Sequence, residues 1–198
     1  MTASLSVMCL MFLSHGFFAD DDITASNEID WSCTSWQDPF RKAFWNSRGW
    51  TFDKDSMQSG VNAEFSAQFK RGYRKLTLSF EIEPLGGRSP SSFVVRLDAP
   101  KQESTVTIEL KSDRVVVSEV RDKKRRIIRQ KKMTVELRKG KPLRLAVAAT
   151  GNRLILILNG RRFLVCNQPA HQSGRDLHFS LVTRKSKFRV RKLRIEGE

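Results

Sequence analysis

Apolar and polar residues alternate with a period of two along much of the chain after Gly60. The alternation is clearest in residues 63–69 and 76–82, where every second side chain is apolar. Successive side chains of a β-strand point to opposite faces, so this period predicts strands that bury one face and expose the other. Shorter versions of the pattern predict ten further strands, at residues 93–98, 105–110, 114–120, 125–128, 133–137, 143–149, 154–158, 162–165, 177–182 and 188–195.

Turn-forming residues separate these segments. Asn159-Gly160 predicts a two-residue hairpin turn with positive φ, and Lys139-Gly140 marks another turn. The best candidate for a helix is a short one at residues 39–46. Many short strands, spaced by about ten residues, favour an all-β, two-sheet antiparallel jelly-roll sandwich over a parallel α/β fold. The alternation assigns the core to Phe65, Leu78, Phe80, Val95, Leu145, Val147, Ile155, Ile157 and Phe179.

Two stretches resemble the concanavalin A-like lectin/glucanase superfamily. The first is "RGW" at Arg48–Trp50, followed by Gly60, Phe69, Gly72-Tyr73 and "KLTLSFEIE". The second is "KPLRLAVAATGNRLILILNGRRFLV", followed by "HFSLVT" and "FRVRKLRIEG", which is similar to the laminin G-like and 3-keto-disaccharide hydrolase-like branches. The resemblance covers residues 45–197 and implies a concanavalin A-like jelly roll. It implies no single activity, because the superfamily includes lectins, hydrolases and domains that only bind.

The N-terminus has the pattern of an export signal. Residues 1–19 contain no charged side chain, and Leu5–Leu13 form an apolar run followed by small residues. This run is shorter than the roughly 20 apolar residues of a transmembrane helix. We therefore predict a signal peptide at residues 1–19 and a secreted, periplasmic or cell-envelope protein with no stable membrane span. An uncleaved anchor and a buried N-terminal element are the alternatives.

The segment at residues 20–44 is expected to be a polar leader that becomes rich in tryptophan and wraps the sandwich, with the domain proper at residues 45–198. All four tryptophans lie between Trp31 and Trp50. They either plug one end of the core or form a platform for sugar rings, with Trp36 and Trp45 as the stacking residues. Core packing is the favoured hypothesis.

Three cysteines occur, and Cys9 lies within the predicted signal peptide. Its removal would leave Cys33 and Cys166, an even pair that suits an oxidising compartment. The pair predicts a disulfide between Cys33 and Cys166. The alternative is two separate buried thiols.

The charge of the chain changes this picture most. There are 36 Lys and Arg against 21 Asp and Glu, a net charge of +15, which attracts polyanions in a salt-dependent way. The segment Arg121–Lys141 alone carries 11 basic and two acidic residues. Asp122–Lys124 predicts a turn, and a change of parity after Ile128 predicts a turn or bulge near Gln130. The predicted polyanion-binding ridge is Lys123, Lys124, Arg125, Arg126, Arg129, Lys131 and Lys132; the alternative is a solvated edge that resists aggregation.

No complete catalytic or metal site is predicted. Glycoside hydrolases on this fold carry an acid and a nucleophile on one strand face, about 5 Å apart. The Glu28-Ile29-Asp30 motif lies ahead of the strands, and Glu81 and Glu83 lie opposite the apolar positions of their strand, as solvated residues do. No zinc spacing or calcium loop is present either, so no cofactor is expected.

The sequence therefore predicts a secreted, non-catalytic binding module for anionic polymers or envelope glycans. The expected partner is an anionic polysaccharide or another polyanion, with cell-envelope glycans as one source. Nucleic acid is less favoured for an exported protein. Two alternatives stay open: a hydrolase of the 3-keto-disaccharide hydrolase-like type, and a lectin for neutral glycans.

Overall fold

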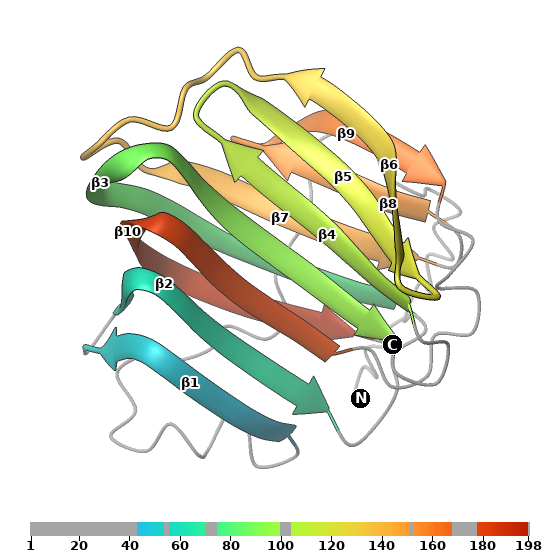
Figure 1. Cartoon of the computed structure of the whole chain (residues 1–198), viewed down its shortest axis with the longest axis horizontal. Coiled ribbons are helices and arrows are strands. Elements are labelled where there is room, and N and C mark those ends of the chain that lie inside the picture. The colour runs from blue at the N-terminus through green and yellow to red at the C-terminus, as the bar shows by residue number, and fades with distance from the viewer. Residues whose placement is uncertain are drawn as a thin grey trace, which may run out of the picture.

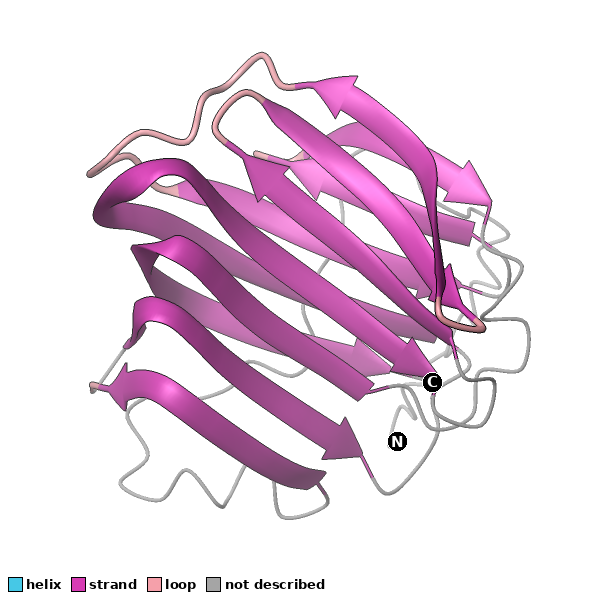
Figure 2. Ribbon diagram, in the orientation of Figure 1, coloured by secondary structure: helices cyan, strands magenta, loops and turns pink. Residues whose placement is uncertain are grey.

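The computed structural model describes residues 43–53, 56–69, 75–99, 104–150, 153–167 and 178–197. Regular structure in these ranges is β-strand throughout, and every strand pairing is antiparallel (Figures 1 and 2). These ranges contain no helix that could cross a membrane. The strands are β1 (Ala43–Phe52), β2 (Ser56–Phe69), β3 (Lys75–Ala99), β4 (Ser104–Lys111), β5 (Arg114–Arg121), β6 (Lys124–Lys132), β7 (Leu143–Thr150), β8 (Arg153–Leu158), β9 (Arg161–Asn167) and β10 (His178–Gly197).

The two longest strands, β3 with 25 residues and β10 with 20, bend and pass through two layers (Figure 1). The second half of β3 pairs with β4, whereas its first half pairs with β7. The front sheet, nearer the viewer in Figure 1, has the order β1-β2-β10-β3-β4-β5-β6. The back sheet continues from the first half of β3 through β7 and β8 to β9. The predicted two-sheet antiparallel jelly roll is confirmed.

The bends of the long strands are fixed by small residues and local hydrogen bonds. The register of β1 against β2 shifts between Arg48 and Trp50, where Gly49 has a φ of 73°. At the bend of β10, the buried Thr183 hydroxyl accepts a hydrogen bond from the Ala63 amide and donates one to the Gly60 carbonyl, both at 3.1 Å. These bonds tie β10 to β2 where both strands leave the front sheet.

The core lies between the two sheets and consists of the inward-facing side chains of both. Eight of the nine predicted core residues are buried, and seven of them belong to the core cluster: Phe65, Leu78, Phe80, Val95, Leu145, Val147 and Phe179. The two isoleucines of β8 were assigned wrongly. Leu154, Leu156 and Leu158 face the core instead, so Ile155 and Ile157 point to the outer face of the back sheet.

Two predicted elements differ in the structure. Residues 133–137 form a loop instead of a strand, because the amides of Met133 and Leu137 bond to the carbonyls of Asp113 and Ser112 at the end of the sandwich. The predicted helix at residues 39–46 is also wrong from Ala43 onward, where β1 begins and pairs with β2. The hairpin turn at Asn159-Gly160 is confirmed, with φ values of 50° and 77°.

Candidate anion-binding face

The predicted ridge lies on β6, an edge strand of the front sheet that pairs with β5. Asp122 and Lys123 form the turn between β5 and β6, with φ values of 50° and 61°, which confirms the turn at this position. The bulge in β6 falls at Ile128, where the register against β5 shifts, two residues before the predicted Gln130. All seven predicted ridge residues are exposed.

The alternation of β6 divides these seven residues between two directions. Arg125 lies opposite Val120 and points away from the core, onto the outer face of the front sheet. Arg129 and Lys131 lie opposite the core residues Val117 and Val115, so they point toward the seam between the sheets.

One of the inward cations holds that seam together. The Lys131 ammonium donates a hydrogen bond of 2.7 Å to the Phe163 carbonyl and lies 4.7 Å from the centre of the Phe163 ring. Because Phe163 belongs to β9, Lys131 links the edge of the front sheet to the edge of the back sheet. Its ammonium is therefore engaged within the fold.

The outer face of the front sheet carries a charged cluster that the sequence analysis missed. The register places Val94, Glu109 and Val116 in one row across β3, β4 and β5. Both valines are buried although they point away from the core.

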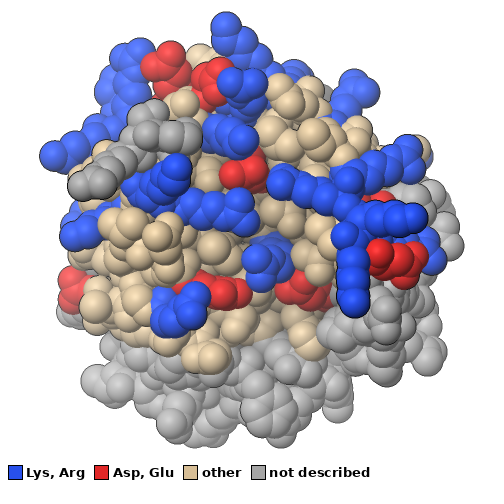
Figure 3. All heavy atoms as spheres, in the orientation of Figure 1, with Lys and Arg blue, Asp and Glu red and all other residues tan. Residues whose placement is uncertain are grey.

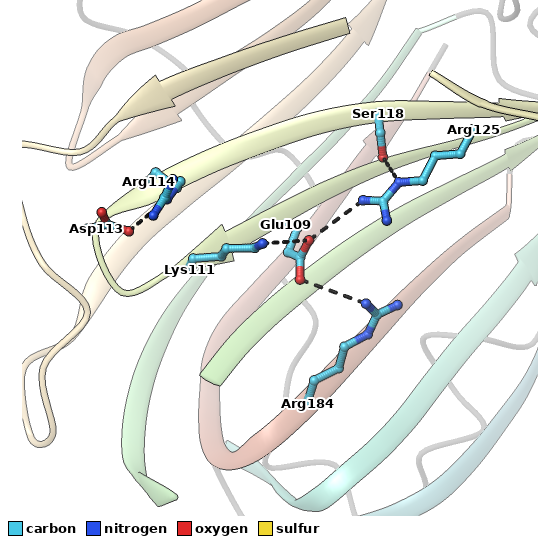
Figure 4. A network of polar contacts seen from close by, with 7 residues as sticks. All are labelled: Glu109, Lys111, Asp113, Arg114, Ser118, Arg125 and Arg184. Atoms are coloured by element: carbon cyan, nitrogen blue, oxygen red, sulfur yellow. Dashed lines mark hydrogen bonds and ion pairs between the residues drawn. The ribbon is translucent and has the colours of Figure 1, made fainter. Parts of the chain in front are cut away.

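Glu109 is the centre of the cluster (Figure 4). Its side chain is only 8% exposed, and three cations surround it, each 3.8 Å from a carboxylate oxygen. These are Lys111 on β4, Arg125 on β6 and Arg184 on β10. The Arg125 Nε also donates to the Ser118 hydroxyl at 3.2 Å, which orients that guanidinium. The cluster therefore joins the predicted ridge to the middle of the sheet.

The charges of this cluster do not balance. Three cations face one carboxylate, whereas the neighbouring pair on the same face, Arg96 and Glu64, is matched one to one at 3.3 Å. Figure 3 shows the result: Lys and Arg side chains dominate the upper and central part of this face, with fewer acidic groups among them. The Arg184 side chain is half exposed and pairs with Glu109, and it donates no hydrogen bond among the described residues.

The two carboxylates predicted to share a strand face lie on the outer face of the back sheet. Glu81 accepts hydrogen bonds from Arg144 at 3.0 Å and Lys192 at 3.2 Å. Glu83 accepts one from Arg189 at 3.3 Å and pairs with Arg191. Both glutamates lie opposite the core face of β3, as expected, but their side chains are only 17% and 18% exposed, because cations cover and neutralise them.

The pKa of Glu81 shows what these contacts do. Partial burial raises it, but the hydrogen bonds and charges of Lys192 and Arg144 outweigh burial, so the pKa of Glu81 lies below its ordinary value. A general acid needs the opposite shift, because it must hold its proton near neutral pH. Glu81 thus lacks this feature of a glycosidase acid.

The remaining candidates lie partly outside the described residues. Trp36, Cys33 and the Glu28-Ile29-Asp30 motif all fall there, and only the backbone of Trp45 is described, on β1. Trp50 is buried in the core, as the core hypothesis expects. No group of three or more metal-ligating side chains occurs among the described residues.

Cys166 is buried on the inner face of β9 and has no disulfide partner among the described residues. Burial raises its pKa to about 11, although the positive charge of Arg129 acts in the opposite direction. Since Cys33 is not described, the disulfide between Cys33 and Cys166 stays a prediction.

The topology, with long strands that bend through both sheets, defines a concanavalin A-like jelly roll. No family model matches the sequence, and no curated protein does so either. Among solved structures, the chain is similar to the carbohydrate recognition domain of Emp46p (TM-score 0.66, 12% identity, 86% of this chain and 95% of that one). It is also similar to the carbohydrate-binding module CBM66 from Bacillus subtilis (TM-score 0.61, 14% identity, 77% and 95%). The chain is also similar to part of a sialidase: the match covers 90% of this chain and only 19% of the sialidase (TM-score 0.59, 10% identity).

Proposed function

We propose that the protein is a non-catalytic binding module for anionic polymers, in particular the acidic glycans of a cell envelope. The observation that carries the proposal is the unbalanced charge of β6 and of the turn before it. Five exposed cations make no side-chain ion pair or hydrogen bond among the described residues: Lys123, Lys124, Arg126, Arg129 and Lys132.

The shape of this surface favours a polymer over a small anion. The nine residues of β6 extend for roughly 30 Å at the usual rise of a strand. A polyanion that follows such a strand meets several cations and displaces the counterions around both partners. Each contact is weak, and many together give measurable, salt-dependent binding.

The glycan part of the proposal is supported by the fold and by the outer face of the front sheet. Emp46p contributes a carbohydrate recognition domain and CBM66 is a carbohydrate-binding module, both with this architecture. The outer face of the front sheet also carries the partly exposed hydroxyl of Thr107 beside its cations, whereas the hydroxyls of Ser118 and Ser180 on the same face are buried. A ligand with both charge and hydroxyl groups would use both kinds of contact.

The test compares two charge-reversed proteins. In the first, Lys123, Lys124, Arg126 and Lys132 are changed to Glu. In the control, four exposed cations elsewhere are changed to Glu, so that the net charge falls equally: Arg48, Lys141, Arg153 and Lys187.

Binding of polygalacturonate and of neutral dextran is measured by calorimetry at low and moderate salt. We expect the unchanged protein to bind polygalacturonate, with an affinity that falls steeply as salt rises. The first variant should lose most of this binding and the control should keep most of it. Equal losses would mean that net charge alone attracts the polymer. Salt-independent binding of dextran, or release of product from an oligosaccharide, would replace the proposal with a neutral lectin or a hydrolase.

A further inference from the structure

Glu109 is an acidic residue in the middle of the proposed anion-binding face, where it weakens attraction for any anion. It is also almost fully buried, although the sheet offers exposed positions for a solvated glutamate. A residue that served only to bind anions would be neutral or basic here. Its position therefore requires another explanation.

The carboxylate of Glu109 has unused hydrogen-bonding capacity. An ionised carboxylate accepts up to about four hydrogen bonds, and hydrogen bonds between nitrogen and oxygen span about 2.7–3.2 Å. The three nitrogens around Glu109 lie at 3.8 Å, and no other described residue donates to it. The carboxylate is thus held by charge alone and can still accept hydrogen bonds from the hydroxyls of a bound ligand.

The surrounding cations supply the complementary half of a site. Arg125 and Arg184 approach Glu109 from two different strands, and their guanidinium groups retain free N–H groups (Figure 4). A guanidinium binds a carboxylate or a sulfate through two parallel hydrogen bonds. An acceptor for a hydroxyl group, Glu109, and donors for an anionic group, Arg125 and Arg184, thus lie side by side on the outer face of the sheet.

We propose that this cluster is a subsite for a sugar unit that carries an anionic group beside a free hydroxyl. The hydroxyl donates to Glu109, and the anionic group binds Arg125 and Arg184. The inference rests on the proposed function and deepens it, because Glu109 makes the module select acidic glycans over polyanions without hydroxyls. Such polyanions meet the negative charge of Glu109 and offer it no hydroxyl beside their anionic groups.

The experiment compares two polycarboxylates at one salt concentration. Polygalacturonate has hydroxyls beside its carboxylates, and poly-L-glutamate has none. If Glu109 accepts hydroxyls, E109Q weakens polygalacturonate binding by about tenfold, the effect of losing a charge-assisted hydrogen bond. The same variant strengthens poly-L-glutamate binding by about threefold, because a repelling charge is gone.

The matched control is E64Q, which removes a carboxylate from the same face where it pairs with Arg96. E64Q should change the affinities for polygalacturonate and for poly-L-glutamate in the same direction, and each change should be smaller than the one that E109Q causes. A second variant, E109D, keeps the charge but withdraws the carboxylate by one methylene. It should weaken polygalacturonate binding and leave poly-L-glutamate binding unchanged. Thermal unfolding of each variant confirms that the sandwich is intact.

The outcomes separate the two proposals. If E109Q strengthens the binding of both polymers, or if E109D binds polygalacturonate as the unchanged protein does, Glu109 is not a hydroxyl acceptor and this inference is overturned. The proposed function would then still stand. If the unchanged protein binds neither polymer at low salt, the proposed function itself fails.

Discussion

The bend of β3 offers a test of how tightly the two layers are joined. Gly87 lies directly against β10: a methyl group placed on its Cα would come within 2.5 Å of the Lys185 carbonyl and 2.6 Å of the Ser186 hydroxyl. Both atoms are held in place, because Ser186 pairs with Gly87 in the sheet and its hydroxyl donates to the Gly86 carbonyl at 2.8 Å. Gly87→Ala therefore forces β3 and β10 apart at the point where both change sheet.

The neighbouring glycine provides the matched control. Gly86 has a positive φ of 135°, but a Cβ there meets nothing within 4 Å. Gly86→Ala thus costs backbone strain alone, whereas Gly87→Ala adds the clash. Overpacking of a tight contact costs about 1–3 kcal/mol, so the free energy of unfolding should be lower in Gly87→Ala than in Gly86→Ala by about 2 kcal/mol. For a chain of this size, that difference lowers the melting temperature by roughly 4–8 °C.

The assay is urea unfolding of both variants and of the unchanged protein, followed by tryptophan fluorescence and by circular dichroism. The two probes should give coincident transitions if the sandwich unfolds as one unit. If the free energies of unfolding of Gly87→Ala and Gly86→Ala differ by less than about 0.5 kcal/mol, roughly the effect of a neutral surface change, the close approach of β3 and β10 is refuted.

Three further predictions concern charge, export and redox state. Because the pKa of Glu81 is lower in the folded protein than its ordinary value of 4.5, ionised Glu81 stabilises the fold above pH 4.5, and this stabilisation is lost as the pH falls through the folded pKa. The difference in free energy of unfolding between the unchanged protein and E81Q should therefore disappear in acid, and a difference that stays constant with pH would contradict this. We propose that the chain is exported, so N-terminal sequencing of the natural protein should begin between Phe17 and Asp20, and an intact Met1 would rule this out. Mass analysis of unreduced peptides should show Cys33 joined to Cys166, whereas two free thiols would exclude the bridge.

Much of the fold could be predicted because most strands bury only one face. In residues 63–69 and 76–82 the inward positions are apolar and the outward ones polar, so the period of two identifies both the strand and its core face. The β8 strand lacks this contrast, since Leu154–Leu158 is apolar at every position. Only its pairing with β7, which places Leu156 opposite Val147, decides which side faces the core.

The wrong elements have a related cause. Met133, Val135 and Leu137 alternate as a strand would, but here Met133 and Leu137 pack against the end of the core while Val135 is exposed. Their backbone amides bond to the β4–β5 turn, which no local pattern reveals. The tryptophan-rich start of β1 likewise shows no alternation, and β1 is held as a strand by its pairing with β2.

The candidate site likewise has a part that the sequence predicts and a part that only the strand pairing reveals. The ridge on β6 could be found because its cations are consecutive in the sequence. The Glu109 cluster could not, because its members come from β4, β6 and β10, and only strand order brings them together. In the sheet, β10 lies between β2 and β3, which places Arg184 in one row with Ser92 and Lys111.

That strand order also explains why the cluster is unbalanced. The C-terminal strand brings Arg184 into a sheet where Lys111 and Arg125 already face Glu109, so one carboxylate serves three cations contributed by three strands. Pairing within a single hairpin would have matched the charges locally, as Arg138 and Glu136 match at 2.8 Å in the loop after β6. The excess positive charge at the middle of the face is therefore a consequence of long-range topology, and the proposed sugar subsite depends on this strand order, which the edge strand alone would not provide.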